Sequence, residues 1–285
     1  MMDFALDAVT KPLLKLRKLI KSFPNDPSPE DVHALRTQAR RLEAILETVT
    51  FNSDKQPKRL RDAMTPVRKA AGGVRDMDVL IGDVLTLSSK DRSGAAVRLV
   101  EHLSEKRERD ARHLYNMVSK RGKKARVLLK QFARLIEKQS NGDRNTITES
   151  AAAPQIVAAQ LDCWPKLDSE NLHEFRIYVK KLRYILQLSQ SSNGRGMKAL
   201  AEAKDSIGDW HDWTELLKIA KKVLDPKADR AMLSQVQKAG DERYRVALTT
   251  ANQLRKQDLD GLVSNAAQSK RLQPAKRTSS RKSGS

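Results

Sequence analysis

A basic segment of about fifteen residues occurs twice in the chain, over residues 32–46 and again over residues 172–186. In both copies a histidine is followed by an arginine, then by a pair of basic residues, and finally by an Ile-Leu pair at the same relative positions. On a helix that turns about 100° per residue, the basic positions share one face and the apolar positions occupy the opposite one. Each copy therefore predicts an amphipathic helix with a cationic stripe, and two such helices predict a polyanion as the ligand.

The stripes contain the residue types that bind phosphate. Arginine offers a planar fork to two oxygens, lysine acts as a point charge, and histidine donates from one or both ring nitrogens. Tyr184 lies on the second stripe, where it either donates to phosphate or packs against neighbours, and Arg183 lies at the edge of that stripe. The candidate binding residues on the two stripes are His33, Arg36, Arg40, Arg41, His173, Arg176, Lys180, Lys181, Arg183 and Tyr184.

A second pair of matching segments follows each stripe, at residues 67–76 and 203–212. Aligning them pairs glycine with glycine and aspartate with aspartate, at Gly72 with Gly208 and at Asp76 with Asp212. The aspartates are expected to orient a neighbouring cation or to cap a helix. A duplicated helical bundle explains both repeats, and if the stripes face its pseudo-twofold axis they line one groove. The segments add four candidate binding residues: Arg68, Arg75, Lys204 and His211.

The whole chain has the periodicity and composition of helices. Aromatic residues make up only 4% of it, and no alternating β-branched run indicates a strand. Gly72 and Gly73 are expected to break the helix that precedes them, or else to allow a bend or a close approach between helices. The predicted fold is all-α, with half-repeats at about 1–140 and 151–268, a linker at 141–150 and a disordered basic tail at 269–285. The predicted helices are 6–20, 30–51, 54–71, 74–87, 93–139, 152–161, 169–190, 196–207, 210–224 and 227–258.

The net charge of +20, from 55 Lys and Arg against 35 Asp and Glu, favours nucleic acids, acidic membranes or phosphate polymers as partners. No stretch of about 18 apolar residues predicts a membrane-spanning helix, and the first residues do not resemble a signal peptide, so a cytoplasmic protein without membrane insertion is expected. The one cysteine, Cys163, excludes an internal disulfide and a cysteine-rich zinc site. It is expected to be a small buried apolar residue.

At these four motifs the sequence resembles the CHAD family, the conserved histidine α-helical domain. The likeness extends from about residue 3 to residue 258, and the motifs that carry it lie at 33–41, 72–80, 172–184 and 207–212. The resemblance implies two pseudo-symmetric helical bundles around a basic central cavity that binds inorganic polyphosphate, an association with polyphosphate granules, and no catalytic activity. Many members are fused to a triphosphatase domain with acidic metal-binding strands. This chain shows no such segment and resembles the stand-alone kind.

The sequence is compatible with three functions. The first is non-enzymatic binding of inorganic polyphosphate, with no cofactor, metal or catalytic residue predicted. The second is a nucleic-acid-binding helical protein, which the net charge supports equally, although few aromatics are present to stack on bases and no helix-turn-helix motif is seen. The third is an enzyme of phosphate transfer or hydrolysis. It would need a carboxylate metal cluster or a Walker-type loop, and the sequence contains neither pattern.

Overall fold

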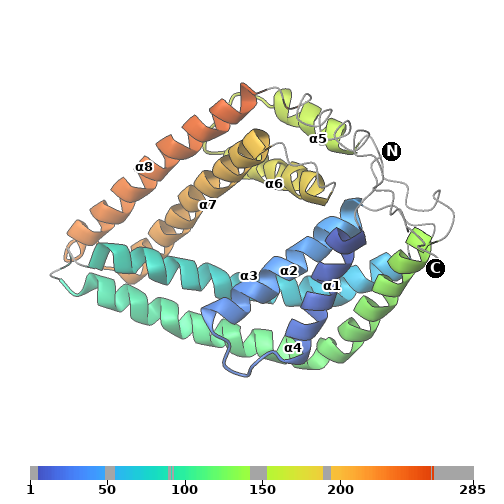
Figure 1. Ribbon diagram of the computed structural model, residues 1–285. Helices are drawn as coiled ribbons and strands as arrows, with labels where there is room; N and C mark the ends of the chain where they lie inside the picture. The colour runs from blue at the N-terminus through green and yellow to red at the C-terminus, as the bar shows by residue number, and fades with distance from the viewer. Residues whose placement is uncertain are drawn as a thin grey trace, which may run out of the picture.

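The computed structural model is built of α-helices, and the part of the chain that it describes contains no strand. That part comprises residues 6–48, 55–88, 91, 93–141, 153–188, 194–257 and 259. The all-α prediction is confirmed (Figure 1), whereas the tail at 269–285 and the linker from 142 to 150 lie outside the described residues. The helices are α1 (Leu6–Lys21), α2 (Pro29–Thr48), α3 (Lys55–Ser88), α4 (Ala95–Asn141), α5 (Ala153–Asp162), α6 (Leu172–Leu188), α7 (Gly194–Val223) and α8 (Arg230–Arg255).

The helix that carries the first stripe begins with a reciprocal cap. The Asp31 backbone N–H donates to Ser28 Oγ at 3.2 Å, and the Ser28 backbone N–H donates to Asp31 Oδ2 at 3.1 Å. Proline at position 29 opens the helix, where its missing N–H has no intrahelical partner to lose. These local contacts fix where α2 starts, and so which of its residues face inward.

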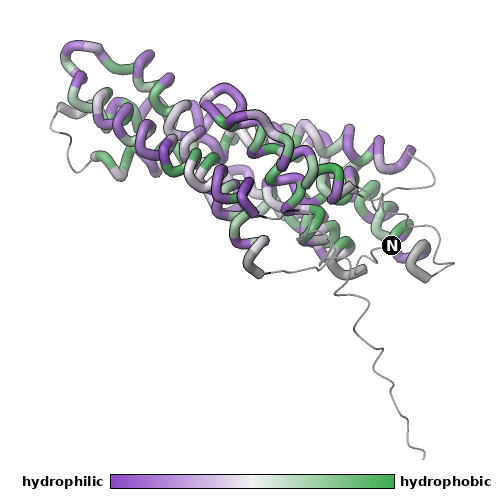
Figure 2. The backbone as a smooth tube through the Cα atoms, turned by 90° about the horizontal axis from the view of Figure 1, so that it is seen from above, coloured by the Kyte–Doolittle hydropathy of each residue, from purple (hydrophilic) through white to green (hydrophobic). Residues whose placement is uncertain are grey.

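The helices are amphipathic, and hydrophilic and hydrophobic residues alternate along them (Figure 2). None of the described helices combines the length and apolar character needed to cross a membrane. Their apolar residues face one another instead. The burial of those residues is the main stabilising contribution, at about 25 cal/mol for each Å² of apolar surface removed from water.

The buried apolar residues form three clusters. The first joins α1, α2, the first half of α3 and the second half of α4. The second joins α5, α6, the first half of α7 and the second half of α8. The third, which we call the shared cluster, joins the remaining halves of α3, α4, α7 and α8. Because each of these four long helices belongs to two clusters, the two helical groups are held together as one body (Figure 1).

Two ion pairs, each with a buried aspartate, reinforce this arrangement. Arg107 on α4 donates from Nε to Asp78 Oδ1 on α3 at 2.9 Å and from Nη2 to the Pro27 carbonyl at 2.7 Å. Arg98, near the start of α4, contacts Asp229 Oδ1 at 2.5 Å, and Asp229 is only 3% exposed. The first pair fixes α4 to α3 and to the connection before α2. The second fixes α4 to the start of α8.

The helices predicted to break at glycine do not break. Helix α3 continues through Gly72, and α7 continues through Gly208, so the predicted boundaries at 71–74 and 207–210 are wrong. Both glycines lie against an arginine of another helix. A Cβ atom at Gly72 would lie 3.8 Å from Arg36 Nε, and one at Gly208 would lie 2.6 Å from Arg176 Nη2. The glycines therefore serve close approach between helices and do not end them.

The expectation that Cys163 is buried is also wrong. Its thiol is free and the residue is exposed. Cys163 follows the last residue of α5, and its backbone N–H donates to the Ala159 carbonyl at 3.0 Å, so it lies at the helix end with its side chain outside the second cluster.

Two glycines in helix interiors should respond differently to alanine. Nothing lies within 4 Å of a Cβ atom at Gly82 in α3, so G82A should stabilise the protein by about 1 kcal/mol through helix propensity, raising Tm by about 2 °C. G208A should give no gain, because the added methyl displaces Arg176 from the carbonyl that it contacts. Thermal unfolding followed by circular dichroism at 222 nm measures both. An equal rise in Tm for the two variants would contradict the close packing at Gly208.

Candidate functional site

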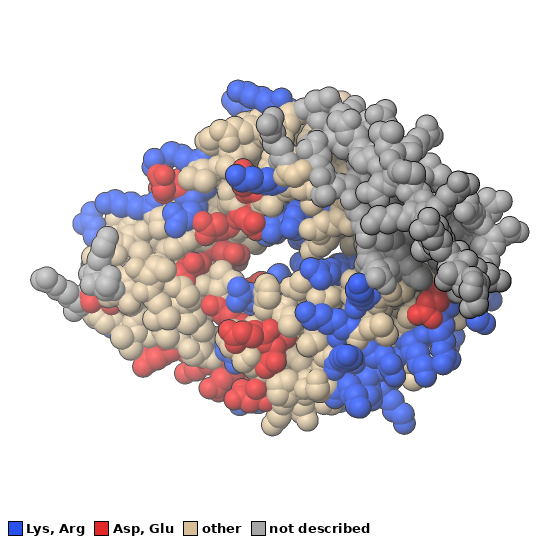
Figure 3. All heavy atoms as spheres, in the orientation of Figure 1, with Lys and Arg blue, Asp and Glu red and all other residues tan. Residues whose placement is uncertain are grey.

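The candidate site is a pocket between the two helical groups, with a volume of about 960 Å³. It is lined mainly by α2, α3, α6 and α7, with Lys106 contributed by α4. Figure 3 shows an opening near the centre of one face of the molecule, with Asp and Glu gathered mostly on one side of it and Lys and Arg mostly on the other. The pocket is therefore charged and polar.

Most of the candidate residues from the sequence line this single pocket. Two do not belong to its lining: Arg41, which is exposed on α2, and Arg183, which is half-buried on α6. The sequence pattern placed these two only at the edge of a stripe or next to it, and their directions on the helices carry them past the cavity. The twelve that line the pocket are His33, Arg36, Arg40, Arg68, Arg75, His173, Arg176, Lys180, Lys181, Tyr184, Lys204 and His211.

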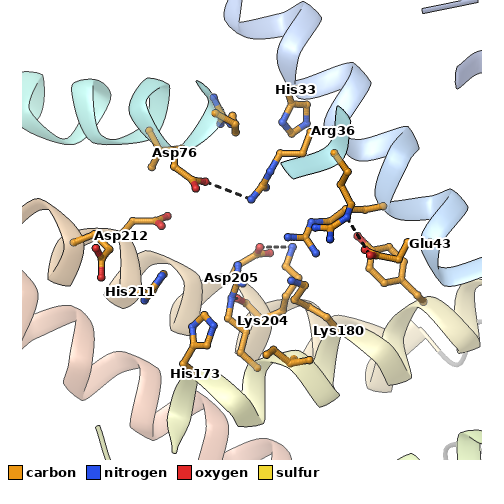
Figure 4. Close-up of a pocket in the computed structure, with 18 of the residues that line it drawn as sticks. His33, Arg36, Glu43, Asp76, His173, Lys180, Lys204, Asp205, His211 and Asp212 are labelled. Atoms are coloured by element: carbon orange, nitrogen blue, oxygen red, sulfur yellow. Dashed lines mark hydrogen bonds and ion pairs between the residues drawn. The ribbon is translucent and has the colours of Figure 1, made fainter. Parts of the chain in front are cut away.

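The two predicted stripes face the same space. Arg36 and Arg40 come from α2, Arg176 and Lys180 come from α6, and Figure 4 shows Arg36 and Lys180 directed into the region between these helices. Helices α2 and α6 are also in direct contact with each other. Four cationic side chains from two sequence-distant helices are thus brought within electrostatic range of one another.

The two equivalent arginines are seated in the same way, each against a glycine of the helix that follows its own in the chain. Arg36 packs beside Gly72 and contacts Asp76 Oδ1 through Nη2 at 3.4 Å. Arg176 packs on Gly208 and donates from Nε to the Lys204 carbonyl at 3.0 Å. Each of these contacts involves only one nitrogen of the guanidinium group. Together with the packing against glycine, they orient the side chain so that its other N–H groups can face the pocket.

Carboxylates share the pocket with the cations, which the sequence reasoning did not anticipate beyond the two aspartates. Arg68 Nε lies 3.0 Å from Glu43 Oε1, and Lys204 forms an ion pair with Asp205. In all, nine Lys and Arg residues and six Asp and Glu residues line the cavity. The excess of positive charge is therefore moderate. It is concentrated around Arg40, Arg176 and Lys180, for which no ion pair is seen within the described residues.

This concentration of charge alters the protonation of Lys180. Burial, followed by repulsion from Arg40 and Arg176, lowers the pKa of its ammonium group to about 7. Burial also lowers the pKa of the Arg36 and Arg176 guanidinium groups. The pocket thus holds positive charge that the protein does not fully neutralise, as expected of a site that binds an anion.

The aspartates predicted to orient cations lie at the acidic side of the pocket. Burial raises the pKa of Asp212 to about 6, while attraction to Arg176 opposes the rise. Burial likewise raises the pKa of Asp76, against the effect of Arg36. Figure 4 shows both carboxylates on the same side of the cavity, with Asp76 directed at Arg36. They compete with any anionic ligand for the two seated arginines.

The histidines are not equivalent. The rings of His173 and His211 lie 4.6 Å apart between centroids, and burial lowers the pKa of both. His33, the counterpart of His173, is exposed, and where α7 has His211 the matching position of α3 is Arg75. One end of the pocket therefore carries a pair of titratable rings, and the equivalent end carries a permanent cation.

Some lining residues could not be identified from the sequence motifs. Lys106 lies outside both repeats, on the long helix α4, where it pairs with Asp110 at 2.8 Å. Glu47 lies on α2 and Glu215 on α7, and neither belongs to the basic pattern that the repeats share. Glu47 follows Arg40 by two helical turns, so helical spacing alone places it on the same face of α2 as Arg40. Within the described part of the chain, no group of His, Cys, Asp and Glu is placed to hold a metal ion.

Comparison with known proteins agrees with this architecture. The crystal structure of the CHAD domain from the plant Ricinus communis is similar with a TM-score of 0.56 at 20% identity, over 94% of this chain and 93% of that one. PptA from Streptomyces chartreusis is similar with a TM-score of 0.54 at 12% identity, over 93% of this chain and 100% of that one. No curated protein matches the chain. The family model of the CHAD domain matches residues 7–221, well over half of the sequence, and the protein therefore belongs to the CHAD domain family.

Proposed function

We propose that this protein binds inorganic polyphosphate in the pocket between its two helical groups. The observation that carries the proposal is the convergence of Arg36, Arg40, Arg176 and Lys180, from two helices far apart in sequence, on one cavity. A buried excess of positive charge costs stability, because desolvation is only partly offset by the acids present. An anionic ligand that enters the cavity offsets that cost.

The shape of the site favours a phosphate chain over an isolated phosphate ion. Successive cations on each stripe are about one helical turn, or 5.4 Å, apart along the axis, so a linear polymer can contact several of them in turn. Arginine on both stripes provides forked contacts, and Lys180 provides a point charge between them. A cavity of about 960 Å³ is at the upper end of the range for small-molecule sites and has room for several phosphate units.

The proposed role is binding without reaction. The residues of the pocket are suited to charge neutralisation, and Asp76 and Asp205 are each paired with a cation, Arg36 and Lys204. We further propose, from the family likeness, that binding places the protein on polyphosphate granules in the cytoplasm. Release of phosphate from polyphosphate by the purified protein above the uncatalysed rate would contradict a purely binding role.

Replacing the pocket cations should abolish most of the binding. The variant with R36A, R40A, R176A and K180A removes four charges from one cavity, and we expect affinity for long-chain polyphosphate to fall at least a hundredfold. The logarithm of the wild-type association constant should fall with the logarithm of salt concentration with a slope of about −4, if six phosphates are neutralised as on a single strand. Fluorescence anisotropy with end-labelled polyphosphate measures both quantities.

Removal of residues 269–285 is the matched control, because it deletes six basic residues that belong to neither of the two stripes. Its effect on affinity should be several times smaller than that of the four pocket substitutions. Equal losses would show that net charge alone governs binding, and a binding constant insensitive to salt would contradict an electrostatic site.

Binding should also weaken as pH rises. In the free protein Lys180 loses its proton near pH 7, and Asp212 becomes charged above about pH 6, so both changes reduce the positive charge of the pocket in the same direction. Because the phosphate chain favours the protonated lysine, affinity should fall between pH 7 and pH 9 by up to about tenfold per pH unit. Isothermal titration calorimetry across this range measures the slope.

The conservative variant K180R tests the assignment of this slope. Its guanidinium keeps its charge throughout this range, so the fall in affinity above pH 7 should be largely lost while binding at pH 6 is retained. The same change at the neighbouring exposed lysine, K181R, serves as the control and should leave the slope unchanged. A full slope in K180R would contradict the role given to Lys180.

A further inference from the structure

A second concentration of positive charge lies outside the pocket, on the outer surface of α1 and the second half of α4. Between Asp110 and Glu137 helix α4 contains no acidic residue. From Lys11 to Lys21 helix α1 contains none either. We call the following set the outer basic face: Lys11, Lys15, Arg17, Lys18, Lys21, Lys120, Arg121, Lys123, Lys124, Arg126, Lys130 and Arg134.

These cations form one continuous surface. All of them are exposed except Arg126, which is half-buried, and Figure 3 shows Lys and Arg side chains gathered over α1 and the second half of α4. The two helices touch closely, since a Cβ atom at Gly122 would lie 3.0 Å from Ile20 Cγ2. Within the described residues, no carboxylate forms an ion pair with the cations at 120–134. Their charge is therefore directed to solvent.

The outer basic face is separate from the pocket. None of its residues lines the cavity, and the first apolar cluster lies between α1 and the inward-facing side of α2. A ligand that lies along α4 on this side therefore leaves the pocket accessible. The inference that follows is independent of the proposed function.

We propose that the outer basic face binds the phosphate backbone of double-stranded nucleic acid, without reading its sequence. The seven cations between Lys120 and Arg134 extend over about 21 Å of helix axis, or one charge for about every 3 Å. A duplex carries one phosphate for about every 3.4 Å on each strand, so the two charge densities match. The face offers lysine and arginine for phosphates and no exposed aromatic side chain for bases.

A membrane surface fits this face less well. Helices that lie on membranes insert an apolar side into the headgroup region, but the apolar sides of α1 and α4 are buried in the first cluster. The large exposed apolar residues on the face are Leu14 and Val127, one from each helix and both among charges. Two isolated aliphatic side chains give little area to insert, whereas a duplex requires none.

The test compares two variants of the full-length protein that each lose four lysine charges. The face variant carries K120Q, K123Q, K124Q and K130Q. The control variant carries four substitutions on exposed lysines of α7, α8 and their connection: K221Q, K222Q, K227Q and K238Q. The probe is a fluorescein-labelled duplex DNA of mixed sequence, about 25 base pairs long, followed by anisotropy between 50 and 200 mM salt.

We expect the face variant to bind the duplex about a hundredfold more weakly than the wild type at 100 mM salt. Its salt slope should be smaller by about 3 to 4, because four phosphate contacts are lost. The control variant and a pocket variant, R36A with R176A, should stay within about threefold of the wild type. Since the substituted lysines are exposed, the Tm of the face variant and of the control variant should be unchanged, which circular dichroism checks.

Several outcomes would overturn the proposal. These are equal loss in the face and control variants, loss of duplex binding in the pocket variant, or no binding of the duplex by the wild type at 50 mM salt. Tighter binding to phosphatidylserine-containing vesicles than to the duplex, through the same four lysines, would assign the face to a membrane. The face variant should retain polyphosphate binding within about threefold. A failure of this proposal is thereby distinguished from a failure of the pocket as a polyphosphate site.

Discussion

The pocket depends on the length of four helices. Helices α3, α4, α7 and α8 extend past their own helical groups and pack against one another in the shared cluster, where Trp213 and Leu99 are almost fully buried. The contact between α2 and α6 and the ion pair of Arg98 with Asp229 also join the two groups, but they involve far fewer residues than the shared cluster. With the shared cluster, α2 and α6 are held at a fixed separation and their cationic stripes face a common space. Apolar burial in one part of the molecule thus places the charges in another.

Placing cations close together in a buried pocket lowers the stability of the protein, and the effect is seen at Lys180, Arg36 and Arg176. Burial and repulsion from Arg40 and Arg176 lower the pKa of the Lys180 ammonium group. The arginines at positions 36 and 176 are held by a carboxylate and by a backbone carbonyl, each beside a glycine that leaves room for the guanidinium. These contacts offset the repulsion between the pocket cations only partly. The positive charge that these contacts leave unneutralised is available to attract an anionic ligand. The same charge lowers the stability of the folded protein, so tighter ligand binding comes with lower stability.

Helical periodicity allowed the fold class and most of the pocket to be predicted from sequence. The two stripes are recognisable because His, Arg and a basic pair recur at the same spacing. Once the apolar side of an amphipathic helix is buried, its cationic stripe must face away from that apolar cluster. The glycine boundaries were wrong because local propensity was outweighed by packing, as at Gly208 beneath Arg176. Lys106 was missed because its approach to the cavity from α4 depends on tertiary contacts that no local pattern encodes, whereas the helical spacing of Glu47 from Arg40 does carry a signal. The duplication of the two halves stays a prediction.

The exposed thiol at the end of α5 has a practical consequence. The sequence contains one cysteine, and Cys163 lies outside the lining of the pocket and away from the outer basic face. A maleimide dye would therefore attach at a single defined position without any engineering of the chain. Because α5 packs against α6, which carries the second stripe, such a dye would report rearrangement of that helix when a ligand enters, while leaving both charged surfaces chemically intact.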